Sequence, residues 1–289
     1  MIVTGRLEVI ATPIGNLGDL TDRARESLAR AHVIAAEDTR RTLVLLQAIG
    51  IARPLVALHA HNERERVPEL IERMVRGETV ALVSDAGTPL LSDPGFELVR
   101  QAIAARIDVR SIPGPSAITA ALSIAGLPVD RFCFEGFLPA NASERRAHLH
   151  DLAHEMRTLV FFEAPHRIAD CLDDLAAVFG AGREAALARE LTKTFETVYR
   201  GTLAELAAVA HTDANVARGE ITIVVRGAAT PAEEGIDMAL LRRTVAALAP
   251  ELPPSRAAAL AAQITGAKRS TAYELVRELS VKPDPQIRR

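Results

Sequence analysis

The residues best suited to ligand chemistry lie in short loops of small side chains that directly follow apolar runs. In the stretch 80–95, the apolar run 80–83 leads into the loop SDAGTP at 84–89. The run is typical of a strand buried on both faces of a parallel sheet, and such sheets bind ligands at the carboxyl ends of their strands. Asp93 and Pro94 then fit the N-cap and first position of a helix over about 96–105. The stretch indicates a ligand loop, although an ordinary strand-to-helix turn shares its composition.

Two more loops also consist mainly of small residues and also directly follow an expected strand. The segment TPIGNLGD at 12–19 follows an apolar run at 7–11, and PGPSA at 113–117 follows the expected strand 108–112. Glycine and other small residues let a backbone approach a ligand closely. Because the carboxyl ends of parallel strands meet at one edge of a sheet, the loops should gather on a single rim. That coincidence favours a binding site over a set of unrelated turns.

The surrounding pattern alternates strands with helices of about ten residues, which predicts a parallel sheet with right-handed crossovers. The expected strands of the first half are 7–11, 33–36, 55–58, 80–83 and 108–112. In the second half they are 131–134, 158–162, 184–188 and 219–226. The fold class is therefore α/β, with two α/β domains at 1–125 and 126–229 and a small helical domain at 236–289.

The C-terminal segment has a different composition from the rest. Residues 236–289 hold nine Lys and Arg against five Asp and Glu, a net charge of +4, so the remainder of the chain carries −7. Ser255 is the expected cap of a helix over 256–264, and a short turn then leads to a helix over 269–279. Helix, Gly-containing turn and helix form the helix-turn-helix pattern, and a small packing or dimerisation bundle is the alternative.

Composition limits the classes of protein. The chain has 289 residues, of which 48% are hydrophobic and 25% charged, as in ordinary globular proteins. No apolar run reaches the ~18 residues of a membrane span, and the N-terminus lacks a secretory signal pattern. The two cysteines, Cys133 and Cys171, have no metal or disulfide spacing, so we expect a cytoplasmic protein. Aromatic residues are only 3%, which disfavours an extended base-stacking platform.

Familiar nucleotide and metal motifs are absent. The sequence has no P-loop, no G-x-G-x-x-G after its first strand and no H-E-x-x-H. His59 and His61 alone are a weak metal signal, and we interpret them as surface or RNA-facing residues. The expected ligand is therefore compact, held by backbone groups and one or two carboxylates, without a metal.

Taken together, the motifs of this sequence resemble those of the ribosomal RNA small-subunit methyltransferase I family, the cytidine 2′-O-methyltransferases of 16S rRNA in the tetrapyrrole-methylase superfamily. The resemblance extends over about residues 5–226, and the basic tail is similar to the C-terminal helical domain of the family. The segments that carry it are ATPIGNL (11–17), AEDTR (36–40), HNE (61–63), VSDAGTPLLSDPG (83–95), PGPSA (113–117), FEGFLP (134–139), EAPHR (163–167) and ARELTK (188–193). Ala164 stands where many relatives have Ser, which should be neutral.

The resemblance implies S-adenosylmethionine bound in a cleft between the two α/β domains, and a homodimer. A Gly-Asp-Pro loop is usual after the fourth strand of the superfamily, and here Thr88 replaces its acid, so Asp85 is expected to supply the carboxylate. The implied cofactor-binding residues are Pro13, Ile14, Ser84, Asp85, Gly87, Thr88, Pro89, Leu91, Ser116, Ala117, Phe162, Leu191, Glu220 and Ile221.

Transfer of a methyl group to a ribose hydroxyl needs a base, or a cation that stabilises developing alkoxide. Lys193 is the first candidate, because burial beside Arg189 should lower its pKa. Glu163 and Glu196 are the rival bases.

Several cations and polar groups are candidates for contact with 16S rRNA in the small ribosomal subunit. The expected substrate-binding residues are Arg40, His61, Asn62, Arg167, Arg189, Lys268 and Arg269. Arginine can clamp phosphates bidentately, and the alternative for each body arginine is a structural ion pair with Glu37, Asp38 or Glu190. Arg269, Tyr273 and Arg277 should share one helix face, unless Tyr273 packs inward.

Two other functions are compatible with part of this pattern. One is C-methylation of a tetrapyrrole, which the basic tail and the few aromatic residues disfavour. The other is a non-enzymatic, RNA-binding ribosome-assembly factor with a vestigial cleft, which the clustered loops disfavour.

Overall fold

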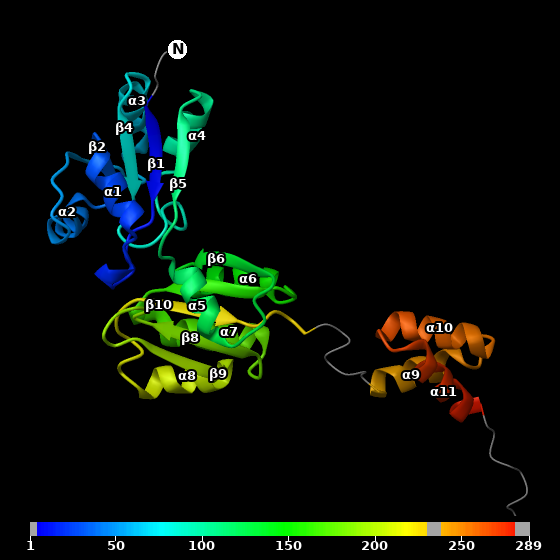
Figure 1. Ribbon diagram of the computed structural model, residues 1–289. Coiled ribbons are helices and arrows are strands. Elements are labelled where there is room, and N and C mark those ends of the chain that lie inside the picture. The colour runs from blue at the N-terminus through cyan, green and yellow to red at the C-terminus, as the bar shows by residue number, and fades with distance from the viewer. Residues whose placement is uncertain (1–4, 230–237, 281–289) are drawn as a thin grey trace, which may run out of the picture. The chain divides into compact units, whose positions relative to one another are not determined.

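The computed structural model describes residues 5–229 and 238–280 (Figure 1). The chain divides into two compact units, the first ending at Arg226 and the second beginning at Gly227. The first unit contains two five-stranded sheets, and the second contains helices.

The first sheet is parallel throughout and has the strand order β3-β2-β4-β1-β5 (Figure 1). Its strands are β1 (Arg6–Ile10), β2 (Val33–Ala36), β3 (Leu55–Ala57), β4 (Thr79–Val83) and β5 (Asp108–Ile112). This is the parallel sheet that the alternating sequence pattern predicts.

The apolar run in β4 is explained by helices on both faces of the sheet. Val80 and Leu82 belong to a buried cluster with side chains of α3 (Glu63–Val75) and α4 (Phe96–Ala104). Ala81 and Val83 belong to a second cluster with α1 (Asp22–Arg30) and α2 (Thr39–Ala48). Successive residues of a strand point to opposite faces, so a strand covered on both sides is apolar at every position.

The helix caps in the structure agree only in part with those predicted from the sequence. The Thr21 hydroxyl caps α1 by accepting from the backbone N–H of Ala24 at 3.1 Å. The prediction of Asp93 as the cap of α4 is wrong, because the helix begins at Phe96 after Gly95, whose φ is 118°. Gly95 is required there: a Cβ would lie 2.7 Å from Cδ2 of Leu82.

The second sheet is mixed, with the order β6-β7-β10-β8-β9. Its strands are β6 (Phe132–Phe137), β7 (Thr158–Glu163), β8 (Glu184–Arg189), β9 (Thr197–Thr202) and β10 (Ile221–Val225). Only β6 and β7 run parallel. Strand β9 was not expected from the sequence, since TVYRGT lacks an apolar run; it is an edge strand that pairs with β8 alone.

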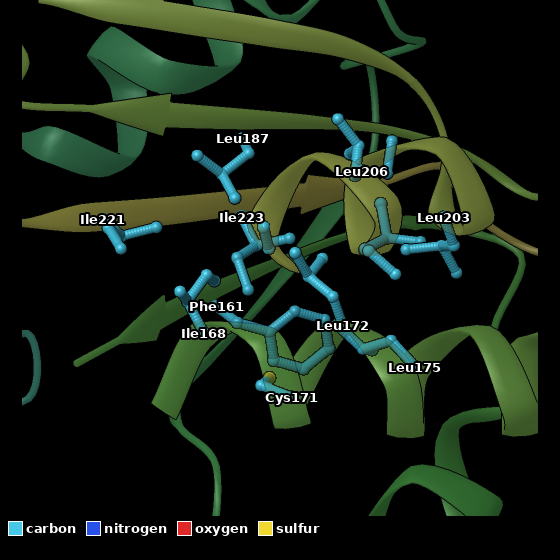
Figure 2. Close-up of a cluster of buried hydrophobic side chains, with 14 of the residues drawn as sticks. Phe161, Ile168, Cys171, Leu172, Leu175, Leu187, Leu203, Leu206, Ile221 and Ile223 are labelled. Carbon is cyan, nitrogen blue, oxygen red and sulfur yellow. The ribbon is translucent and has the colours of Figure 1, made fainter. Parts of the chain in front are cut away.

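The main core of this second half lies between the sheet and its helices α6 (Ala142–Leu152), α7 (Ile168–Phe179) and α8 (Leu203–Thr212). Side chains of β7, α7 and α8 meet around Phe161, which is fully buried (Figure 2). This packing fixes the direction of β7 and therefore the position of the residues at its end.

Helix α5 (Ala117–Ala125) covers the other face of the second sheet. Its side chains Ile118 and Leu122 cluster with Val160 of β7 and Val224 of β10. We expected this helix to belong to the first domain, up to residue 125. It packs instead as part of the second half, because its apolar face matches that sheet.

The second unit consists of α9 (Met238–Leu248), α10 (Pro254–Thr265) and α11 (Arg269–Ser280) around a small core of alanine, leucine and valine. The cap of α10 is Pro253 rather than the predicted Ser255, whose hydroxyl accepts from Arg269 at 3.1 Å. Proline at the first helical position allows the helix to begin without a side-chain cap. Within residues 5–229 and 238–280, no helix is both long and apolar enough to cross a membrane.

Candidate functional site

A cavity of about 390 Å³ lies where the small-residue loops of the first sheet meet the ends of β7, β8 and β10. Most of the expected cofactor-binding residues line it. They are Ile14, Asp85, Gly87, Thr88, Leu91, Ser116, Ala117, Phe162, Leu191, Glu220 and Ile221. Pro13, Ser84 and Pro89 are not among the lining residues; Ser84 and Pro89 are buried, and Pro13 is partly buried.

Hydrogen bonds join the three loops of the rim. Thr12 and Gly87 exchange two backbone hydrogen bonds, of 2.8 and 3.0 Å. The Thr88 hydroxyl donates to the carbonyl of Pro115 at 3.1 Å. Gly87 has a φ of 79°, and a Cβ there would lie 3.3 Å from Cγ2 of Ile14 on the cavity wall. The absence of side chains at this point therefore keeps the cavity open.

Two loops beside the cavity have strained backbones. Leu90, Ser92, Glu190 and Thr192 all have positive φ, between 52° and 74°. They are four of the five non-glycine residues with positive φ in the described part of the chain. Such conformations cost free energy and persist where the surrounding structure imposes them, often at ligand sites.

Three carboxylates meet on the first-sheet side. Asp85 accepts from the backbone N–H of Asp38 at 3.0 Å and pairs with Arg41 at 3.3 Å, so part of its hydrogen-bonding capacity is used within the protein. Burial raises the pKa of Glu37, although the backbone N–H of Asp85 opposes the shift. Burial also raises the pKa of Asp93 to about 6, and the nearby charges of Glu37 and Asp85 add to the shift.

Glu37 and Asp93 were missed as cavity residues by the sequence analysis. Asp93 was interpreted as a helix cap, and Glu37 only as a partner for an arginine. The signal that could have found them is their place in the loops that follow β2 and β4 at one edge of the sheet.

The surroundings and the pKa of Lys193 differ from those predicted. Its ammonium lies 2.7 Å from Glu190 and 3.3 Å from Glu220. Burial alone would lower its pKa, but the hydrogen bond to Glu190 and the charge of Glu220 outweigh that effect, and the pKa is raised. The expected lowering is wrong, because the carboxylates and not Arg189 are its neighbours. Lys193 is a cation at neutral pH.

The two rival bases, Glu163 and Glu196, differ in burial and in their position relative to the cavity. Glu163 lines the cavity with a fully buried carboxylate, which accepts from Arg167 at 3.1 Å and from the backbone N–H of Ala164 at 2.7 Å. Glu196 is exposed, lies outside the lining and accepts from the backbone N–H of Thr192 at 2.5 Å.

The arginines that were expected to clamp phosphates make hydrogen bonds and ion pairs within the protein. Arg189 is buried and donates to the carbonyls of Arg218 and Phe195 at 2.9 and 2.8 Å. Arg167 also donates to the carbonyl of Leu138 at 2.7 Å. Arg40 has an 89% exposed side chain that pairs with Asp38 at 2.7 Å, and so remains accessible to a ligand.

A second cavity, of about 490 Å³, adjoins the first. It is lined by Glu37, His59, Ala60, His61, Glu63, Ser92, Asp93, Pro94, Gly95 and Phe96. Asn62 shapes its wall rather than lining it: the amide donates to the carbonyl of Ala57 and accepts from the N–H of His59. Across the described ranges, no three His, Cys, Asp or Glu side chains gather as a metal site would need.

In the helical unit, Lys268 and Arg269 are both exposed at the start of α11. Tyr273 and Arg277 are exposed as well, so the face that the four-residue spacing predicts is accessible. Tyr273 does not pack inward.

The fold and the family comparison define the class of protein. Residues 6–207 match the model of the tetrapyrrole (corrin/porphyrin) methylases, and residues 236–280 match that of the RsmI C-terminal HTH domain. The crystal structure of the methyltransferase CobJ has a TM-score of 0.58 at 21% identity, covering 78% of this chain and 96% of that one. Uroporphyrin-III C-methyltransferase from Thermus thermophilus, complexed with S-adenosylhomocysteine, has a TM-score of 0.54 at 18% identity, covering 77% and 97%. The chain is a tetrapyrrole methylase by fold.

Curated relatives narrow the class to one family. Ribosomal RNA small subunit methyltransferase I of Xylella fastidiosa strain Temecula1 is 56% identical, over 94% of this chain and 99% of the relative. The protein of the same name from Pseudomonas aeruginosa is 53% identical, over 93% and 96%. The chain belongs to the ribosomal RNA small subunit methyltransferase I family.

Proposed function

We propose that this protein transfers a methyl group from S-adenosylmethionine to the 2′-hydroxyl of a cytidine in 16S rRNA of the small ribosomal subunit. The observation that carries the proposal is the cavity of small-residue loops in a chain of this family. The names of the relatives state small-subunit ribosomal RNA as their substrate. The cytidine and the ribose hydroxyl come from the family resemblance of the motifs.

The cavity fits the proposed cofactor in size and in charge. Its volume of about 390 Å³ lies within the range of small-molecule sites. Gly87 opens one wall, and apolar side chains line the cavity, among them Ile14 of the loop after β1 and Phe162 of β7. Glu37, Asp85 and other carboxylates outnumber the single lining arginine, which suits the positive charge of a sulfonium.

S-adenosylmethionine supplies an activated methyl on a leaving group that needs no protonation. The residues of the chain must therefore position the two reactants and accept a proton from the ribose hydroxyl, which is a poor nucleophile. Positioning in well-aligned systems contributes on the order of 7–11 kcal/mol.

The RNA is held mainly by charge. Arg40 is exposed and precedes Arg41, which lines the first cavity, while His61 lines the second. Lys268 and Arg269 are exposed at the start of α11. RNA-binding by these groups, a homodimer and a cytoplasmic location complete the proposal, and they rest on the family resemblance.

The test is a methyl-transfer assay with purified protein, labelled S-adenosylmethionine and small-subunit particles that lack the modification. The expected product is 2′-O-methylcytidine in 16S rRNA, identified by mass spectrometry of nuclease digests and by resistance of the adjacent bond to alkali. A methyl group on a base, or transfer to a tetrapyrrole and not to RNA, would contradict the proposal.

A further inference from the structure

Arg167 joins two segments of the wall of the first cavity, although it does not line the cavity itself. One nitrogen of its guanidinium donates to the carboxylate of Glu163 at 3.1 Å. The same nitrogen donates to the carbonyls of Leu138 and Pro139, at 2.7 and 3.1 Å. Glu163 ends β7 and lines the cavity, and Phe137, the last residue of β6, lines it as well. The side chain of Arg167 is only 21% exposed, so little of it is accessible to a phosphate.

We propose that Arg167 is a positioning residue of the cofactor site: it holds the carboxylate of Glu163 and the end of β6 in the arrangement that binds S-adenosylmethionine. It acts on the cofactor through these neighbours and not by contact with RNA. The inference rests on the proposed function, in which the cofactor occupies this cavity. It replaces the role of phosphate clamp that the sequence suggested.

Glu163 needs a cation beside it, because its side chain is fully buried. A buried carboxylate is unfavourable unless it is paired and hydrogen-bonded. One oxygen accepts from the N–H of Ala164 at 2.7 Å. The nearby Cys171 thiol stays neutral, since burial and the charge of Glu163 raise its pKa. The guanidinium of Arg167 is therefore the positive charge that balances the carboxylate at the cavity wall.

The carboxylate of Glu163 can serve the cofactor in two ways. Its negative charge adds to that of Glu37 and Asp85 on the cavity wall, which favours a positively charged sulfonium. A carboxylate has about four lone-pair sites, so it can also accept from an N–H or O–H of the ligand. Both uses require a fixed direction of the carboxylate, which the ion pair with Arg167 imposes.

Phe137 reaches the cavity wall because of an irregularity in β6. This edge strand pairs with β7 alone, and its register shifts between Phe134 and Gly136. The extra residue of such a bulge puts Phe134 and Phe137 on the same face of the sheet. Both rings pack against Phe162, at 4.9 and 5.7 Å between ring centroids.

The chain leaves the sheet directly after Phe137. The side chain of Leu138 is buried in the main core, which fixes where the turn lies. The bonds from Arg167 to the carbonyls of Leu138 and Pro139 fix how its backbone is oriented. A change at Arg167 should therefore alter the wall around Phe137 without unfolding the turn.

Arg145 is a second buried arginine at the same turn, and it is the matched control. It donates to the carbonyl of Ala140 at 3.3 Å and pairs with Asp174 of α7 at 2.6 Å. It does not line the cavity, and its hydrogen bonds go to the turn and to α7. A replacement there disturbs the turn and removes a buried ion pair, but leaves Glu163 and Arg167 paired.

Calorimetry with S-adenosylmethionine on folded, full-length variants is the first test. Arg167→Gln should weaken binding roughly 10-fold or more, the scale of a lost charge-assisted hydrogen bond. Arg167→Lys keeps the charge but not the fork that reaches both segments, so its affinity should lie between those of wild type and Arg167→Gln. Arg145→Gln should bind the cofactor like wild type, even though denaturant unfolding shows a loss of stability.

Steady-state kinetics on small-subunit particles separate this role from a phosphate clamp. Arg167→Gln should raise KM for S-adenosylmethionine and leave KM for the particles unchanged. Arg40→Ala is the reverse case, because the side chain of Arg40 is exposed and is expected to contact RNA. It should raise KM for the particles and leave cofactor affinity unchanged.

A second pair of variants tests the wall itself. Phe137→Ala removes a 56% exposed ring from the cavity and should weaken cofactor binding. Phe132→Ala, at the other end of β6, is the control, because Phe132 is 41% exposed and lines neither cavity. In Arg167→Lys/Phe137→Ala the two losses of affinity should not add in full, because Arg167 acts partly through Phe137.

Three results would overturn the proposal. They are wild-type cofactor affinity in both Arg167 variants, an equal loss of affinity in Arg145→Gln, and a rise of KM for the particles alone in Arg167→Gln. Fully additive losses in the double variant would overturn the part played by Phe137.

Failure of the proposed function has a different signature, because calorimetry needs no RNA. Wild-type protein that binds S-adenosylmethionine but forms no 2′-O-methylcytidine contradicts the function and leaves the comparison of Arg167 with Arg145 intact. Wild-type protein that binds no S-adenosylmethionine overturns both proposals.

Discussion

At the scale of single residues, Lys193 shows how neighbours decide a role. Its ammonium joins Glu190 of one loop to Glu220, the residue before β10. The Glu190 carboxylate also accepts from the N–H of Glu220 at 2.9 Å. The group therefore fixes the loop that presents Leu191 to the cavity.

We expect Lys193→Ala to weaken cofactor binding several-fold and to lower the free energy of unfolding by about 1 kcal/mol, the scale of a partly exposed, hydrogen-bonded ion pair. Calorimetry and denaturant unfolding measure the two effects. A roughly 10²-fold loss of kcat with unchanged cofactor affinity would instead return Lys193 to a catalytic role.

Asp93 should reduce stability at neutral pH. Its folded-state pKa of about 6 lies above the ordinary value of 3.8, so folding disfavours its charged form. Well above pH 6 the folded protein bears the whole cost, which falls as the pH drops through about 6 and disappears about one pH unit below 3.8, where the residue is protonated in both states.

Asp93→Asn should therefore raise the free energy of unfolding on the order of 1 kcal/mol at pH 7.5, after discounting for solvent screening at this partly exposed group. Most of the gain should be lost at pH 4, which lies close to the ordinary pKa of 3.8. Urea unfolding of variant and wild type at both pH values measures the difference. A loss of stability at pH 7.5 would mean that the carboxylate stabilises the folded chain.

At the scale of elements, the site depends on loops that adjoining strands hold together. The loops after β1, β4 and β5 lie at one edge of the parallel sheet because all its strands point the same way. The bridge between Thr12 and Gly87 then locks two of them. A substitution that shifts one loop should therefore also shift the loop bonded to it, and so change the shape of the cavity.

Gly87→Val should abolish most cofactor binding, because its side chain would approach Ile14 and fill the cavity. Gly50→Val is the matched control. Gly50 also has a positive φ, of 72°, but nothing lies within 4 Å of its Cβ position. Both variants should lose about 1–2 kcal/mol of stability from backbone strain. Calorimetry on the folded fractions should show lost affinity for Gly87→Val only; equal affinities would remove Gly87 from the cofactor site.

At the scale of the whole molecule, the chain combines an acidic body with a basic helical unit. The second unit has its own buried core around Leu241, Val245 and Val276. The first unit ends at Arg226, directly after its last strand, β10. Each unit therefore has the packing expected of a body that folds by itself.

Truncation after Gly235 should leave the first unit folded and able to bind the cofactor, with much weaker affinity for small-subunit particles. The loss should shrink as salt rises, because counterion release supplies much of the binding of basic groups to RNA. Binding of full-length and truncated protein across a salt series measures it. The double variant Lys268→Ala/Arg269→Ala keeps the unit and should show part of the same loss. Equal affinities at low salt would make the tail a packing or dimerisation element.

The sequence alone determined the parallel sheet and the place of its loops, for a local reason. A strand covered on both faces must be apolar at each position, as in 80–83, and a backbone that approaches a ligand needs small residues, as in 84–89. Both requirements can be read within a few neighbouring positions. The same motifs indicated the family.

Tertiary structure alone decided what depends on partners far away in the chain. Strand β9 exists because β8 pairs with it, and α5 belongs to the second half because Val160 and Val224 receive its apolar face. Glu190 and the distant Glu220 together raise the pKa of Lys193, and burial beside Glu37 raises the pKa of Asp93. Burial and charge at these positions arise from side chains that meet only in the folded chain, so no local pattern records them.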